Sequence, residues 1–241
     1  MRNPPTRRAG RLFAIAGIVA VFVATWWVTR SPIFDMRSLR VSGASHVSGA
    51  RVAALAGLDA HSNVLWLSTS RIERSLERDP WIESATVQRS LPGTVTIAIR
   101  ERRPVAVAMP GSWLIGADGA VLGRAAGGAV SVPRITPGVR LRAGMTISPA
   151  RLQLAIARDL PQPLAAAVRS VETNRGTGVS LELRMGGAVE LGQPVDLPAK
   201  YAALRAVLAW VSRRGIGVHT IDVRAPQAPA VRGATGSPSS S

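Results

Sequence analysis

Residues that could carry out chemistry are few and widely spaced in this chain of 241 residues. Cysteine is absent, which excludes disulfides, thiol nucleophiles and cysteine-ligated zinc. His46, His61 and His219 lack any metal-ligand spacing, and no G-x-S-x-G motif supplies a serine nucleophile. Nothing singles out two of the 14 acidic residues as a glycosidase pair. We therefore predict that the protein is not an enzyme, with no catalytic residue, metal site, cofactor or small-molecule substrate.

The charge balance leaves two interpretations open. A net charge of +16 suits a polyanionic partner, or it reflects a solvated surface of scattered arginines. The arginines are spread over the whole length, without the aromatic-basic interleaving of single-strand binders. The solvated surface is the favoured interpretation, and no nucleic-acid partner is predicted.

Residues 12–28 predict a transmembrane helix. This stretch of 17 residues carries no charge, and it would be about 26 Å long against a bilayer core of about 30 Å. Arg11 and Arg30 flank it, and Trp26 and Trp27 lie where an interfacial aromatic belt belongs. The alternatives are a buried core helix and a cleavable signal peptide, although no clear small-x-small cleavage site follows.

The basic residues before this segment set the expected orientation. Residues 1–11 contain four arginines and no acid, which is typical of a cytoplasmic tail. The prediction is a single-pass membrane protein with its long C-terminal part exported. An exported domain would not meet the chromosome.

Residues 33–103 read as one small α+β unit in the order β-α-α-β-β. Ser48 can cap a short helix that Gly57 closes, and Ser70 with Glu73 has the spacing of a capping box for a second helix. Pro92-Gly93 forms a turn between two strands, the second running from Thr94 to Arg100. Three more charged residues and Pro104 follow Arg100, which stops that strand.

A second, β-rich α+β domain is predicted over residues 104–224. Hairpin patterns surround Ala117-Asp118-Gly119 and Gly186-Gly187, and an apolar stripe at helical spacing starts at Leu197. Residues 217–224 form a last strand. Residues 225–241 lack a pattern and are predicted to be a disordered tail.

Several of these stretches resemble the FtsQ/DivIB family of bacterial cell-division proteins. They are "LRVSGASHVS", "DPWIESATVQRSLPGTVTIAIRERRPVA", "WLIGADGAVL" and "IDVR", and the likeness covers roughly residues 33–224. The first unit resembles the family's POTRA (polypeptide-transport-associated) domain. The motif residues that carry the likeness are Pro80, Trp81, Pro92, Gly93, Glu101, Arg102 and Pro104.

The resemblance implies a non-enzymatic scaffold in the bacterial plasma (inner) membrane at the division septum. Its exported part would bind FtsB and FtsL, with FtsW and FtsI as further partners, and help to control septal peptidoglycan synthesis. The alternatives are a POTRA-bearing export or outer-membrane assembly component, and an exported peptidoglycan-binding or hydrolytic protein. The boundary at Arg102-Arg103-Pro104 is either a charged linker or a partner contact.

The resemblance also implies that the last strand accepts a strand from FtsB, because an edge strand exposes unpaired N–H and C=O groups. The alternation places His219, Ile221 and Val223 on one face. The predicted partner-binding residues are Val218, Thr220, Ile221, Asp222, Val223 and Arg224. The alternative is an internal strand with both neighbours present. Unlike the family, this chain continues with Pro226 and Pro229, so the contact is expected to be short or to use Ala230 and Val231 differently.

Overall fold

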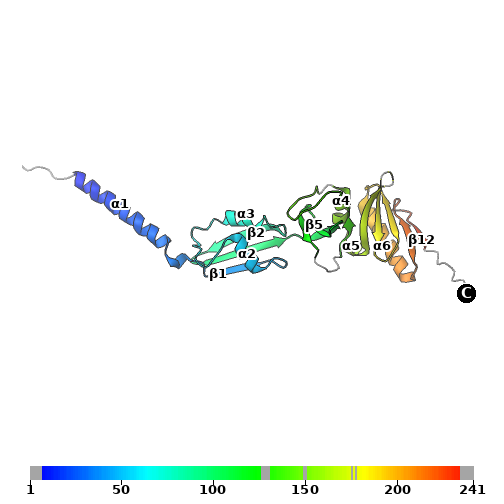
Figure 1. Cartoon of the computed structure of the whole chain (residues 1–241), viewed down its shortest axis with the longest axis horizontal. Helices are drawn as coiled ribbons and strands as arrows, with labels where there is room; N and C mark the ends of the chain where they lie inside the picture. The colour runs from blue at the N-terminus through cyan, green and yellow to red at the C-terminus, as the bar shows by residue number, and fades with distance from the viewer. Residues whose placement is uncertain (1–6, 126–130, 149–150, 175, 177, 234–241) are drawn as a thin grey trace, which may run out of the picture. The chain divides into compact units, whose positions relative to one another are not determined.

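The computed structural model describes residues 7–125, 131–148, 151–174, 176 and 178–233, with side chains in the first helix from Ile15 onward. Two compact units meet between Glu101 and Arg102. Each unit has its own sheet and its own hydrophobic core, and Figure 1 shows the elements of each. Residues 1–6 of the predicted cytoplasmic tail and residues 234–241 of the predicted disordered tail lie outside the described residues.

The chain begins with the helix α1 (Arg7–Thr29), followed by the single turn η1 (Pro32–Phe34). Every residue of α1 from Ile15 to Val28 is exposed. Among the residues that the structure describes, no helix combines the length and the apolar character needed to cross a membrane.

The first unit contains three strands and two short helices after α1. In chain order they are β1 (Ser38–Ser42), α2 (Gly49–Ala56), α3 (Thr69–Leu76), β2 (Ile82–Ser90) and β3 (Thr94–Glu101). The sheet order is β1-β3-β2, with β1 parallel and β2 antiparallel to β3. The predicted order β-α-α-β-β is confirmed. Val52 of α2 and Leu76 of α3 are fully buried in the same core as Ile97 of β3.

Local signals explain one of these helices and fail for the other. The Ser48 hydroxyl accepts a hydrogen bond from the Arg51 N–H, and Gly57 ends α2 with φ of +63°, as predicted. The predicted capping box of α3 is wrong: the N-cap is Ser68, and it makes no side-chain cap bond. The Glu73 carboxylate instead accepts the Val87 N–H at 2.8 Å, because this β2 amide lies within its reach.

The end of β3 marks the change from one sheet to the other. β3 continues one residue beyond the predicted end, to Glu101, and Pro104 opens β4 of the second sheet. The charged stretch that follows the strand is therefore the connection between two sheets.

Among the residues that the structure describes, the second unit is a nine-stranded sheet with three helices. Its strands are β4 (Pro104–Ala108), β5 (Trp113–Gly116), β6 (Val121–Arg124), β7 (Arg134–Ile135), β8 (Val168–Asn174), β9 (Gly178–Leu183), β10 (Ala188–Gly192), β11 (Val218–Asp222) and β12 (Ala230–Gly233). Its helices are α4 (Leu152–Asp159), α5 (Gln162–Ala167) and α6 (Leu197–Arg214). The sheet order is β12-β11-β10-β9-β8-β7-β4-β5-β6.

Helix α6 is attached to this sheet by apolar packing and by one buried lysine. Tyr201, Leu204 and Val211 are buried in the core of the second unit. The Lys200 ammonium donates to the Leu191 carbonyl at 2.8 Å and to the Gln193 carbonyl at 2.7 Å. These bonds hold the start of α6 at the end of β10, the strand that pairs with β11.

Candidate partner-binding site

The strand predicted to be the free edge is an internal strand. β11 runs parallel to β10 on one side and antiparallel to β12 on the other. The prediction of an edge at residues 217–224 is therefore wrong, because the chain folds back and pairs with β11 itself. The alternative interpretation, an internal strand with both neighbours present, is correct.

The position of the two prolines explains how the chain can return. Pro226 and Pro229 lie in the connection between β11 and β12, where the Ala228 N–H donates to the Ala225 carbonyl. Because a proline in the ladder would lack a donor, their place outside it leaves Ala230–Gly233 free to pair. The prediction of disorder over residues 225–241 is thus wrong for this segment.

Strand β12 is now the edge of the sheet. Among the described residues it pairs only with β11. Ala230, Arg232 and Gly233 are exposed, whereas Val231 packs partly against the core. A short edge strand with one anchored side chain offers unpaired backbone groups that another polypeptide strand can satisfy.

A β-bulge changes which side chains of β11 face the core. The register with β12 shifts between Val218 and Thr220, which makes His219 the extra residue. Val218 is consequently buried together with Ile221 and Val223, and His219 is exposed. The predicted faces are therefore wrong at Val218 and His219. An aspartate at Val223 would disrupt the core, since this side chain is 0% exposed.

The exposed face beside β12 carries paired charges. Glu190 of β10 is the register partner of Asp222, whose carboxylate accepts hydrogen bonds from the Arg224 guanidinium at 2.5 to 3.0 Å. These bonds lower the pKa of Asp222. A shallow groove of about 590 Å³ lies here, lined by Glu190, Thr220, Asp222, Arg224, Ala230, Val231 and Arg232. Three of the six predicted partner-binding residues, Thr220, Asp222 and Arg224, thus lie beside the edge.

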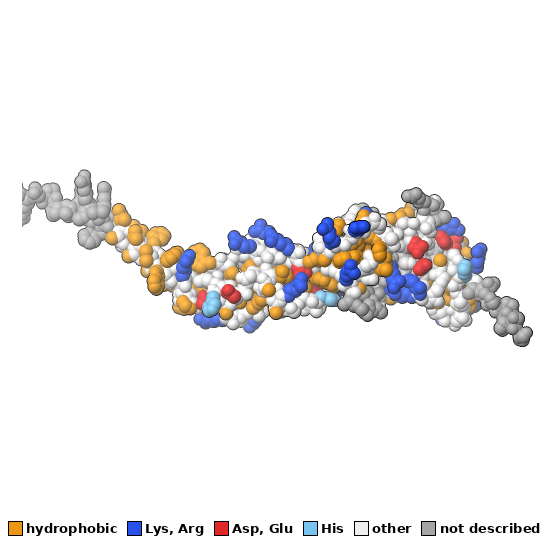
Figure 2. All heavy atoms as spheres, viewed as in Figure 1, with side chains coloured by type: hydrophobic (Ala, Val, Ile, Leu, Met, Phe, Trp, Pro, Cys, Tyr) orange, Lys and Arg blue, Asp and Glu red, His pale blue; other side chains and the backbone are white. Residues whose placement is uncertain are grey.

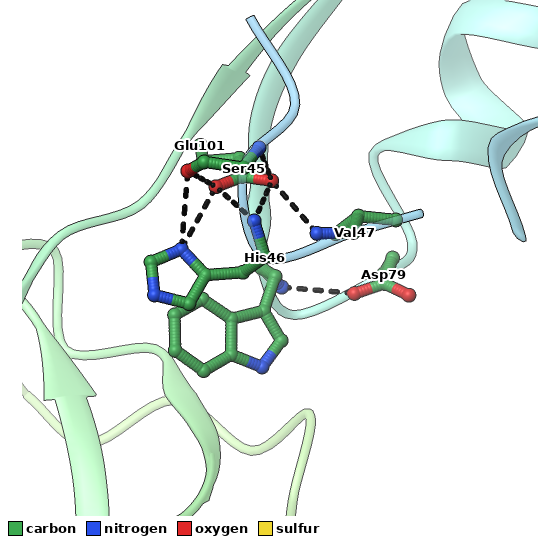
Figure 3. Close-up of polar contacts among 6 residues, drawn as sticks. Ser45, His46, Val47, Asp79 and Glu101 are labelled. Atoms are coloured by element: carbon green, nitrogen blue, oxygen red, sulfur yellow. Dashed lines mark hydrogen bonds and ion pairs between the residues drawn. The ribbon is translucent and has the colours of Figure 1, made fainter. Parts of the chain in front are cut away.

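The motif residues of the first unit form a second polar site around Glu101 (Figure 3). Its carboxylate accepts the backbone N–H groups of Ser45, His46 and Val47 at 2.8 to 3.0 Å, and also the Ser45 hydroxyl at 2.7 Å. The Glu101 side chain is 7% exposed. A carboxylate at the end of β3 therefore holds the loop that follows β1.

Trp81 and Asp79 extend this site. The Trp81 ring stacks on His46 with centroids 4.6 Å apart, and the Trp81 backbone N–H donates to the Asp79 carboxylate at 3.0 Å. The buried Asp79 carboxylate also accepts two hydrogen bonds from Arg51 of α2, at 2.9 and 2.7 Å. The motif residues Trp81 and Glu101 thus meet through His46, at the junction of α2, α3 and β3.

Pro80 lies in this site between Asp79 and Trp81, whereas the other motif residues lie apart from it. Pro92 and Gly93 form the β2–β3 turn, where a Cβ on Gly93 would lie 2.5 Å from the Asp35 carbonyl. The Arg102 guanidinium donates to the Asp118 carboxylate at 2.8 Å within the second unit. Burial raises the pKa of Asp118, but the hydrogen bonds, the one from Arg102 foremost, and the positive charge of Arg102 lower that pKa more. The motif residues therefore make contacts in several separate parts of the fold.

The pH dependence of stability follows from Glu101. Burial raises the pKa of Glu101, but the hydrogen bonds from Ser45, Val47 and His46 lower it more, from 4.5 to about 2. Because the folded-state pKa is depressed, the stabilisation is complete above about pH 4.5 and is lost as the pH falls toward 2. We expect the Ser45–Val47 amides to lose hydrogen-exchange protection over this range. In Glu101→Gln this pH-dependent loss should be absent, and an unchanged profile in the variant would contradict the assignment.

Sequence reasoning missed most partners of Glu101. Ser45 and Val47 are ordinary loop residues in the sequence, and no local spacing connects them to a carboxylate that is 54 residues or more away in the chain. Only the fold brings them together.

The side chains of three of the four predicted membrane-interface residues are described, those of Trp26, Trp27 and Arg30. The Trp26 and Trp27 side chains are 53% and 74% exposed, and the Arg30 guanidinium lies 4.4 Å from the centroid of the Trp26 ring. Arg11 belongs to the part of α1 whose side chains are not described.

Known proteins similar to this chain are named as cell-division proteins. The family of FtsQ-type POTRA domains matches residues 34–102. A "Cell division protein FtsQ" of Thiomonas arsenitoxydans is 26% identical over 91% of this chain and 83% of its own length. One of Streptomyces collinus is 27% identical over 95% and 92%, respectively. A "Cell division protein DivIB" of Geobacillus kaustophilus is 30% identical over 40% of this chain and 37% of its own.

Proposed function

The chain belongs to the FtsQ/DivIB family of bacterial cell-division proteins, and from this premise we propose that it is a non-catalytic scaffold of the septum. In this proposal the second unit binds FtsB and FtsL, with FtsW and FtsI as further partners. The scaffold connects early and late division proteins and thereby helps to control septal peptidoglycan synthesis.

The observation that carries this proposal is the edge formed by β12. A partner strand that adds to β12 would extend the nine-stranded sheet, and main-chain hydrogen bonds would supply the affinity. The groove over Asp222, Arg224 and Arg232 would then select the side chains of that strand. Val218, Ile221 and Val223 take part only as the buried support of β11.

We propose further that α1 anchors the protein in the inner membrane, with the N-terminus in the cytoplasm. Two observations support this. The sequence carries no charge over residues 12–28, and the described side chains of α1 between Ile15 and Val28 expose large apolar groups such as Phe22, which is 72% exposed. The 23 residues of α1 would span about 34 Å, enough for the hydrocarbon core of a bilayer.

A fluorescent fusion to the full chain in dividing cells tests the proposed function. We expect the signal to concentrate in a midcell band, because a septal scaffold is held there by its partners. Deleting Ala230–Gly233 removes the edge strand and should weaken the band while leaving the membrane signal. A uniform membrane signal from the unaltered chain would contradict the division role.

A further inference from the structure

Three loops meet at the end of the first unit that adjoins α1, and we call this region the basal end. It consists of residues 30–37, residues 59–67 and the β2–β3 turn at residues 91–93. The Met36 N–H donates to the Ser62 carbonyl at 2.9 Å, and the Val64 N–H donates to the Phe34 carbonyl at 2.8 Å. The Arg37 N–H donates to the Gly93 carbonyl at 2.7 Å. These bonds fix the three loops against one another.

Large apolar side chains are exposed at the basal end. Ile33 is 55% exposed, Trp66 is 64% exposed and Leu91 is 56% exposed. Within residues 30–101, all of which are described, these three are the exposed large hydrophobic residues. One of them lies on each loop. Figure 2 shows hydrophobic side chains along α1 and at the end of the unit that it joins. Apolar exposure concentrated at one end marks a contact surface.

Side chains fix the conformation of the loop that carries Trp66 by hydrogen bonds to its backbone. The Arg89 guanidinium donates to the Leu65 carbonyl at 2.7 Å and to the Leu67 carbonyl at 3.2 Å. The Asn63 side chain accepts the Leu65 N–H at 3.0 Å. Val64 of the same loop is 0% exposed. The loop therefore buries Val64 and presents Trp66 to the outside in a fixed geometry.

The basal end is also tied to α1. The Asn63 amide donates to the carbonyl of Thr29, the last residue of α1, at 2.9 Å. Trp26 and Trp27 lie within one turn of this residue, and a concave surface of about 520 Å³ there is lined by Trp26, Trp27, Val28, Arg30, Ser31 and Pro32. The exposed apolar surface of α1 thus continues through η1 to the basal end.

We propose that the basal end rests on the outer leaflet of the bilayer, with Ile33, Trp66 and Leu91 inserted among the lipid headgroups. This inference rests on the proposed anchoring of α1. Continuity with the apolar surface of α1 favours lipid as the occupant. Tryptophan and arginine together also suit an interface, where an apolar body meets a wet, polar layer.

The charges around the three side chains fit the same surface. Arg30, Arg37 and Arg89 lie on the loops or directly beside them, and the acids there are Asp35 and Asp59. The small basic excess suits phosphate headgroups, although the apolar area supplies most of the binding. The contact would hold the first unit against the membrane and restrict its swing about η1.

The absence of cysteine makes a direct test possible, because one introduced cysteine gives a unique labelling site. The full chain carrying Leu91→Cys, or Ile33→Cys as a second position, is labelled with an environment-sensitive fluorophore and reconstituted into vesicles of phosphatidylethanolamine and phosphatidylglycerol. The matched control is Ser84→Cys. Ser84 is exposed and lies on β2, the strand that leads into the turn of Leu91, about 23 Å from residue 91 along the chain.

Labels at positions 91 and 33 should be quenched by nitroxide-labelled lipid and shielded from aqueous iodide. The label at position 84 should be quenched by iodide and little affected by the nitroxide-labelled lipid. Adding Trp66→Ser should reduce the lipid quenching at position 91. Equal iodide access at positions 91, 33 and 84, in a chain that floats with the vesicles, would overturn the proposal while leaving the anchoring intact. A chain that fails to float with the vesicles would instead contradict the anchoring on which the inference rests.

Discussion

Replacing Glu101 with alanine is expected to destabilise the first unit by about 2–4 kcal/mol, a large share of a typical folding free energy. The substitution leaves the backbone N–H groups of Ser45, His46 and Val47 without their acceptor. Each was bonded to a charged oxygen in a site that is nearly closed to water, so the loss exceeds that of a surface hydrogen bond. Denaturant unfolding of the exported part, combined with hydrogen exchange at these amides, measures the effect.

Glu83→Ala is the matched control for this substitution. Glu83 lies on the neighbouring strand β2 and pairs with Arg100 at 3.0 Å, and its side chain is 41% exposed. An exposed ion pair contributes at most about 1 kcal/mol, so this variant should remain close to the unaltered protein. Glu101→Gln keeps one acceptor oxygen without the charge and should fall between the two. Equal losses for Glu83→Ala and Glu101→Ala would show that Glu101 does not organise the loop.

A proline in β12 is expected to reduce the proposed binding of FtsB by about tenfold or more when it occupies a position whose N–H faces the free edge. Neighbouring N–H groups of a strand point to opposite sides. Of Val231→Pro and Arg232→Pro, one therefore removes a donor toward β11 and the other removes a donor at the edge. The edge variant should bind poorly at an unchanged melting temperature, and the other should lower the melting temperature.

Arg232→Ala provides the control for strand addition because it removes the side chain and keeps the backbone N–H. Its affinity should stay near that of the unaltered protein if main-chain bonds carry the binding. Affinity for the exported segment of FtsB and thermal unfolding are measured for all three variants. Unchanged affinity in both proline variants would remove β12 as the binding edge, and a further partner surface would then have to exist.

Patterns that act within a few residues were sufficient to predict the first unit. The alternation from Thr94 onward, the Pro92-Gly93 turn and the Ser48 cap with Gly57 all describe local backbone choices, and the structure confirms each of them. Local polar signals were less secure. Glu73 had the correct spacing to cap α3, yet its carboxylate serves a strand amide, because tertiary contacts offered a competing donor.

The sequence alone determined the secondary-structure order of the first unit, the family of the chain and the uncharged stretch at residues 12–28, since each depends on neighbouring residues. Only the tertiary structure decided that β12, not β11, forms the edge of the sheet, that a bulge at His219 turns Val218 inward, and that Glu101 meets three distant amides. The physical reason is the same in each case. The neighbours of a strand and the donors to a carboxylate come from chain segments that are remote in sequence. Local periodicity does not indicate which of these segments will pack against the strand or the carboxylate.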